Sequence, residues 1–168
     1  MGRMSTKDRK TAYHMAREKM GISREKASEL TGIEVSKIER IENEKVNKID
    51  PYDVQAMADA YKEPMLCNYY CTNECPIGRK YVPEVKIENL KEITIEMLAS
   101  LEELDLQKTK LLQIARDGMI DDAELEDFVA IQKELEQISM AVEALQIWSE
   151  RMIADGKIDE KKYRNLMK

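Results

Sequence analysis

Residues 22–43 read ISREKASELTGIEVSKIERIEN, and this stretch decides the fold of the first half of the chain. Apolar residues repeat at helical spacing on both sides of a glycine, and Ser23 stands where a helix N-cap is expected. The pattern predicts two short helices, at 24–30 and 34–41, that meet at a glycine turn. Such a pair needs a small residue at the helix crossing, a glycine in the turn and aliphatic residues on the buried faces. We assign these positions to Ser28, Gly32, Ile33, Ile38 and Ile41.

The flanking sequence predicts further helices. Residues 10–20 form a first helix that ends at Gly21, and we expect its inner stripe to be Ala12, Met15, Ala16 and Met20. A later helix begins at Asp50-Pro51, where Asp50 caps the free amides and Pro51 suits the first helical position. One or two more helical turns are predicted within 65–78, before a Pro-Ile-Gly loop.

Beyond Pro83 the apolar residues keep heptad spacing, which predicts a long helix with a seam. The seam positions are Ile87, Leu90, Met97, Leu101, Leu104, Leu111 and Ala115. Asp121 and Glu124 form the sequence pattern of a capping box for a second long helix, which ends near Ala154. Helices of about 32 residues joined by a turn of two or three must run antiparallel. A short final helix follows Asp159.

The composition supports an all-α fold and excludes several functions. Charged residues make up 36% and aromatic residues 5%, which suits long exposed helices. The net charge is −6, but residues 1–80 have 15 basic and 13 acidic side chains, so we place any nucleic-acid contact there. No apolar run is long enough to span a membrane and no signal peptide is evident, so we expect a cytoplasmic protein of bacterial or phage type. A single histidine and the absence of catalytic motifs argue against an enzyme.

The segment from about residue 10 to residue 63 resembles the phage repressor and Cro family of regulators, in its xenobiotic-response-element form. The matching positions are Ser23, Glu25, Glu29, Gly32, Ile33, Ser36, Ile38, Arg40, Ile41 and Glu42. The resemblance implies a five-helix lambda-repressor-like helix-turn-helix domain, followed here by the antiparallel hairpin and the short last helix. We therefore expect two domains: residues 1–80, which include a cysteine segment at 67–78, and residues 81–168, which form a dimerisation or interaction domain.

The resemblance also implies how double-stranded DNA would be contacted. The helix at 34–41 would enter the major groove, with Val35, Ser36, Lys37 and Arg40 near base edges. Arg24, Asn43 and Lys45 would face phosphates, while Glu42 would face away from DNA. Glu34 and Glu39 are unusual on such a helix because acids repel the phosphate backbone. The alternative is a helix-turn-helix retained for protein contacts, as in an adaptor or an antitoxin-like partner.

All three cysteines lie within nine residues and are spaced C-x3-C-x3-C, at Cys67, Cys71 and Cys75. On one continuous helix this spacing would align the thiols on one stripe. The thiols could be small buried side chains, a redox switch, or ligands of a metal or iron–sulfur site with His14 as the fourth donor. The last two possibilities would make the protein a metal- or redox-responsive regulator; otherwise no cofactor is expected.

The predicted hairpin has more apolar residues than one partner helix can cover. The extra positions are Ile93, Ile95, Leu98, Leu106, Leu112 and Ile114. A second copy would cover them in a four-helix bundle, so we expect a homodimer formed through residues 84–154. A different protein on the same stripe is the alternative.

Overall fold

The structure is a computed structural model that describes residues 10–86, 89–116 and 118–168, and every regular element in those ranges is a helix. The all-α prediction is therefore confirmed. The helices are α1 (Ala12–Lys19), α2 (Arg24–Thr31), α3 (Val35–Glu42), α4 (Pro51–Tyr61), α5 (Met65–Asn73), α6 (Gly78–Tyr81), α7 (Leu90–Ile114), α8 (Leu125–Ala154) and α9 (Glu160–Leu166). None of the helices found in these ranges is long and apolar enough to cross a membrane.

The chain divides into two compact units. One contains the residues up to Val82 together with Glu150–Lys168, and the other is Pro83–Ser149. The predicted domain boundary between residues 80 and 81 lies close to the end of the first stretch. The C-terminal Glu150–Lys168 segment, in contrast, groups with the N-terminal unit and not with the hairpin.

Local capping accounts for where the N-terminal helices begin and end. The Ser23 hydroxyl accepts a hydrogen bond from the Lys26 amide at 3.2 Å, and the Asp50 carboxylate accepts one from the Tyr52 amide at 2.9 Å. Gly32 ends α2 with a φ of 72°, a left-handed conformation that glycine adopts without strain. The predicted caps and the glycine turn are confirmed.

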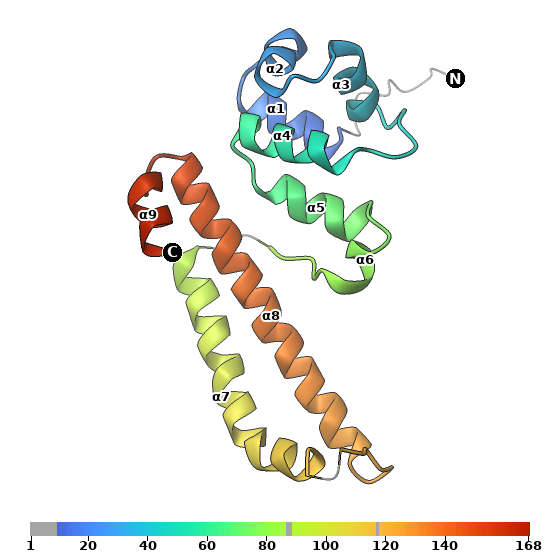
Figure 1. The fold of residues 1–168 in the computed structure, drawn as a ribbon, viewed down its shortest axis with the longest axis vertical. Helices are drawn as coiled ribbons and strands as arrows, with labels where there is room; N and C mark the ends of the chain where they lie inside the picture. The colour runs from blue at the N-terminus through green and yellow to red at the C-terminus, as the bar shows by residue number, and fades with distance from the viewer. Residues whose placement is uncertain (1–9, 87–88, 117) are drawn as a thin grey trace, which may run out of the picture. The chain divides into compact units, whose positions relative to one another are not determined.

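The core of the N-terminal unit gathers around α4, which contacts α1, α2 and α5 (Figure 1). Its side chains come from α1 to α5 and from the α2–α3 and α3–α4 connections, and the largest that are almost completely buried are Tyr13, Ile38, Ile41, Val54 and Met57. The predicted inner stripe of the first helix is partly wrong. Ala16 is buried, but Met15 and Met20 are exposed and Tyr13 is buried in their place. The helix is rotated because the large Tyr13 ring and the paired Arg17 both face inward.

The C-terminal half forms the predicted antiparallel hairpin of α7 and α8 (Figure 1). The helices have 25 and 30 residues and are joined through residues 115–124, so the connection is longer than the predicted turn. The capping box is confirmed, since the Asp121 carboxylate accepts from the Glu124 amide at 2.9 Å and the Glu124 carboxylate accepts from the Asp121 amide at 3.4 Å. Asp159 caps α9 as predicted, at 2.8 Å from the Lys162 amide.

The predicted seam of α7 is partly wrong. Ile93 and Ile114 were assigned to the outer face but are buried, while Leu90 and Leu101 were assigned to the seam and remain about two-fifths exposed. Ile87 lies outside the described residues. An ideal helix drifts relative to a strict seven-residue repeat, so a straight helix does not keep every heptad position facing its partner.

Candidate nucleic-acid interface

α2 and α3 form the helix-turn-helix, and Ala27 is the buried residue of α2. The Ala27 side chain is completely buried, whereas Ser28, which is predicted at the helix crossing, is half-buried. The amide of Gly32 donates a hydrogen bond to the Ser28 carbonyl at 2.9 Å, so the backbone of Ser28 helps to form the turn. Ser28 as the small residue at the helix crossing stays a prediction.

The two faces of α3 have different roles. Ile38 and Ile41 point into the core, and their exposed fractions are 0% and 1%. Ser36, Lys37 and Arg40 are exposed on the other side, and Val35 is half-buried at the start of the helix. The predicted base-reading side chains thus share the outward part of α3.

The basic side chains of this face differ in their availability. The ammonium of Lys37 lies 2.5 Å from a carboxylate oxygen of Asp53 on α4, and this hydrogen bond raises the pKa of Lys37. Arg40 is exposed and forms no ion pair with any residue that the structure describes. Arg40 is therefore the cation of α3 that can bind an external anion directly, whereas Lys37 must first break its ion pair with Asp53.

The buried carboxylate of Glu42, the last residue of α3, ties the C-terminal end of that helix to α1 and α2. Glu42 accepts from Arg17 through both oxygens, at 2.5 and 3.0 Å, and from Nε of Arg24 at 2.7 Å. Burial alone would raise the pKa of Glu42, but the hydrogen bonds and charges of the two arginines outweigh it and hold the pKa below its usual value. This Glu42 clamp joins α1, α2 and α3, and the Glu42 side chain is buried.

The residues predicted to face phosphates are only partly free. Arg24 keeps 30% of its side chain exposed while it binds Glu42. The Asn43 amide donates to the Glu39 carbonyl at 2.7 Å and so caps the end of α3. Lys45 is exposed, and Glu44 precedes it in a left-handed conformation with a φ of 54°. Lys45 is therefore the least committed of the three.

Acidic side chains balance the basic ones on this surface. Between residues 34 and 45 the exposed acids are Glu34, Glu39 and Glu44, and the exposed bases are Lys37, Arg40 and Lys45. The formal charges cancel, so the outward face of α3 is not a basic patch. Contacts made by individual side chains, and not a broad positive field, would have to hold an anionic partner.

The cysteines do not form the continuous stripe that the spacing allowed. Cys67 and Cys71 lie one turn apart on α5, but the helix ends at Asn73 and Cys75 lies beyond its cap. The sulfur of Cys75 accepts from the Gly78 amide at 3.4 Å, and a Cβ on Gly78 would lie 2.2 Å from the Cys71 carbonyl oxygen. The predicted Pro-Ile-Gly loop therefore makes a tight return of the chain onto α5, and its closeness depends on a contact that no sequence pattern indicates.

The described residues contain no group of three or more histidine, cysteine, aspartate or glutamate side chains placed to hold a metal ion. His14 lies 3.1 Å from the carboxylate of Glu18 on its own helix. Cys67 is exposed, and in the metal-free protein desolvation raises its pKa to about 11, with the charges of Asp59 and Glu150 adding to the effect. A metal site at the three cysteines and His14 stays a prediction from the spacing.

Comparison with known proteins identifies one part of the chain. Residues 14–62 match the family model of a helix-turn-helix domain, which covers most of α1 and all of α2, α3 and α4. No curated protein and no solved structure matches the chain. The N-terminal unit therefore contains a helix-turn-helix domain.

Proposed function

We propose that this chain is a sequence-specific DNA-binding transcriptional regulator that acts as a dimer, of the repressor and Cro type that its sequence resembles. The observation that carries the proposal is the α2–Gly32–α3 unit, which buries one face of α3 and leaves Ser36, Lys37 and Arg40 exposed on the other. The family match over residues 14–62 supports the same use. In this proposal the protein works in the cytoplasm of a bacterium, alongside bacterial or phage DNA.

Arg40 is the side chain that we expect to contribute most to base recognition. It is exposed and unpaired among the described residues, and a guanidinium can bind a guanine edge through two hydrogen bonds. Val35 suits a thymine methyl group, and Ser36 can bind either base edges or phosphate. Lys37 would join after leaving Asp53, and Arg24, Asn43 and Lys45 would flank the site at phosphates.

Binding to the upstream region of the chain's own gene, compared with a random duplex at moderate salt, tests the proposal. We expect the wild type to prefer the upstream DNA, and Arg40→Ala to weaken that complex by roughly 1–3 kcal/mol, which is about tenfold or more. Arg79→Ala removes an exposed arginine from α6 and serves as the matched control. Equal affinity of the wild type for both duplexes would reject sequence-specific regulation.

An adaptor function is the second candidate, and the acids on the outward face of α3 favour it. The Glu39→Gln variant distinguishes a DNA-binding protein from a protein adaptor. Glu39 is exposed, so the substitution leaves the core untouched. A DNA reader should bind its duplex a few-fold more tightly after this change, since one repulsive charge is lost. A protein adaptor would show no DNA affinity in either form.

The dimer part of the proposal rests on the hairpin. Its helices expose large apolar side chains along their lengths, namely Ile95, Leu98, Leu106, Leu112, Leu125, Val129, Leu135 and Val142. Such a stripe is typical of an interface with another helical pair, and two copies could then read half-sites about 34 Å apart. Residues 84–154 would form the contact.

Native mass spectrometry of the full chain tests the dimer. The wild type should be dimeric at micromolar concentration, and the double variant Leu98→Glu with Leu106→Glu should be monomeric, because the two side chains are 60% and 74% exposed in one chain. Lys161→Glu, at an exposed position of α9 outside residues 84–154, changes the net charge by the same amount and is the control that should stay dimeric. A monomeric wild type, or a double variant that still pairs, would contradict a dimer through this stripe.

A further inference from the structure

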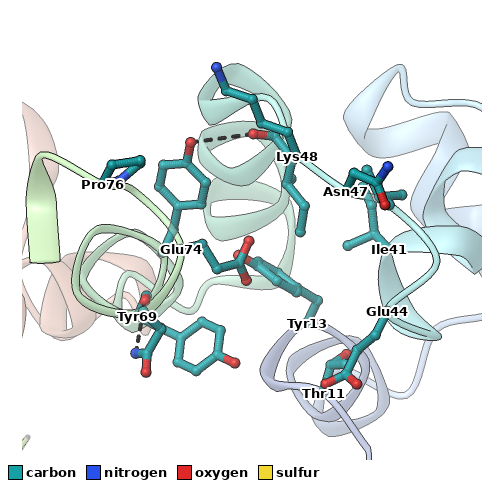
Figure 2. A pocket seen from close by; sticks show the side chains of 13 residues that line it. Thr11, Tyr13, Ile41, Glu44, Asn47, Lys48, Tyr69, Glu74 and Pro76 are labelled. Atoms are coloured by element: carbon teal, nitrogen blue, oxygen red, sulfur yellow. Dashed lines mark hydrogen bonds between the residues drawn. The ribbon is translucent and has the colours of Figure 1, made fainter.

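A cavity of about 540 Å³ opens in the N-terminal unit between α1, the α3–α4 loop and α5 (Figure 2). Its apolar lining comes from Ile41 and Ile49, which are both almost fully buried. Three tyrosines, Tyr13, Tyr69 and Tyr70, supply aromatic walls. Neither the helix-turn-helix surface nor the cysteines account for this pocket.

The aromatic walls are held in place by interactions from distant parts of the chain. The rings of Tyr13 and Tyr69 meet edge to face, with their centroids 5.8 Å apart. The Tyr70 hydroxyl donates to the Ile49 carbonyl at 3.3 Å, which ties α5 to the α3–α4 loop. The pocket is therefore built before any ligand enters, which lowers the entropic cost of binding.

The ionic groups of the pocket are mainly acidic. The carboxylate of Glu74 lies next to the Tyr13 ring and accepts a hydrogen bond from its hydroxyl at 3.0 Å (Figure 2). Glu44 lies on the other side of the same pocket. Neither carboxylate forms an ion pair with a lysine, arginine or histidine in the part of the chain that the structure describes. The ammonium of Lys48 points away from the centre of the pocket in Figure 2.

The pKa of Glu74 shows the electrostatic consequence of these acidic surroundings. Burial raises the pKa of its carboxyl, the hydrogen bond from Tyr13 lowers it, and the charge of Glu44 raises it further, so that the net shift is upward. A positive charge placed between the two carboxylates would relieve both the desolvation and the repulsion. Aromatic faces attract the same kind of charge through their quadrupoles, most strongly when the cation is poorly hydrated.

We propose that this pocket binds a small organic cation, whose ammonium group would lie between Glu74, Glu44 and the tyrosine rings while an apolar arm contacts Ile41 and Ile49. A bare metal ion is a poorer fit, because the described residues offer no cluster of ligands for one. The proposal does not depend on DNA binding. Because Ile41 belongs to α3, a bound cation would nevertheless touch the helix that the proposed function places on DNA.

Titration of the full-length protein with benzyltrimethylammonium, followed by NMR, tests the site. We expect saturable shifts that centre on pocket residues, with benzyl alcohol and phenylacetate binding about tenfold more weakly because they lack the positive charge. Equal binding of all three compounds would show that only apolar contact matters and would overturn the proposal. So would the absence of saturable binding at millimolar probe.

Two variants locate the effect. Glu74→Gln keeps an acceptor for Tyr13 and should weaken benzyltrimethylammonium binding about tenfold, while Tyr69→Leu should weaken it through loss of a ring. Glu29→Gln on α2 removes the same charge from an exposed position outside the pocket and should leave binding unchanged. Equal weakening by Glu74→Gln and Glu29→Gln would mean that only the net charge attracts the probe, which would overturn a specific site. Circular dichroism of each variant establishes that it is folded.

Discussion

Glu42 is buried and Glu74 half-buried in the N-terminal unit, and desolvation acts on both carboxyl groups, yet their pKa values shift in opposite directions. The two regions are adjacent, since Ile41, which precedes Glu42, lines the pocket that contains Glu74. Two guanidinium groups occupy both oxygens of Glu42, whereas Glu74 accepts one hydrogen bond from a phenol. Desolvation acts on both carboxyl groups, so it is the hydrogen-bonding and charged partners that decide whether the charge is stable.

This difference separates structural from functional use of the same residue type. The Glu42 clamp satisfies its own charge and leaves nothing for an external ligand. Glu74 keeps an uncompensated charge beside a cavity, which is the condition that an incoming cation can relieve. Three substitutions, at Glu42, Gly78 and Glu74, test this difference through the stability of the protein.

The largest effect is expected from Glu42→Gln. It removes the charge that balances Arg17 and Arg24, and Arg17 is itself buried, so the free energy of unfolding should fall by roughly 3 kcal/mol. Chemical denaturation followed by circular dichroism measures the change. Glu39→Gln, on the exposed face of the same helix, is the control and should change the stability by less than about 0.5 kcal/mol. Equal stability of the two variants would mean that the clamp contributes nothing.

A smaller loss is expected from Gly78→Ala, which disturbs the packing of α6 against α5. The added Cβ would meet the Cys71 carbonyl at 2.2 Å, so the backbone must move, and we expect a loss of about 2 kcal/mol by the same denaturation assay. Alanine in an undisturbed helix would instead stabilise the protein by roughly 0.5–1 kcal/mol relative to glycine. A rise in stability would therefore contradict the close approach of α6 to α5.

The smallest change in the free energy of unfolding is expected from Glu74→Gln, and here the sign of the change is what matters. Because the folded pKa of Glu74 is raised, its favourable contribution is complete below the usual value of 4.5 and is lost as the pH rises through the folded pKa. At neutral pH the variant should be as stable as the wild type or more stable, by less than about 1 kcal/mol.

The pH dependence of Glu42 should have the opposite sign. Its folded pKa is lowered, so its contribution is present above 4.5 and is lost as the pH falls through the folded pKa. Stability curves of the wild type and both glutamine variants between about pH 3 and pH 8 measure the two differences. If the stability differences of both variants from the wild type changed with pH in the same direction, the contrast between the clamp and the pocket would be wrong.

Much of the fold could be predicted because its signals are local. The caps at Ser23, Asp50 and Asp159, the turn at Gly32 and the Asp121 capping box each depend on residues within four positions, and all are present. The rotation of α1 was missed because Met15 and Tyr13 are both good core candidates by hydrophobicity. The tertiary contact of the ring with Glu74 and Tyr69 decided between them.

The candidate DNA surface shows the same division. The outward position of Ser36, Lys37 and Arg40 follows from helical periodicity around Ile38 and Ile41. The pairing of Lys37 with Asp53, and of Arg24 with Glu42, joins side chains from different helices. No pattern in residues 22–43 could distinguish the unpaired Arg40 from the paired Lys37.

By itself the sequence determined most of the helices, their capped N-terminal ends, the turn of the helix-turn-helix and the existence of the hairpin, because capping and amphipathic periodicity act over a few neighbouring residues. Only the tertiary structure decided how the charged and aromatic side chains are used. Arg17 and Glu42 are 25 positions apart, and Tyr13 and Glu74 are 61 apart. Folding brings such groups together, and the partner that each meets decides whether a glutamate becomes a structural clamp or the charged wall of a pocket.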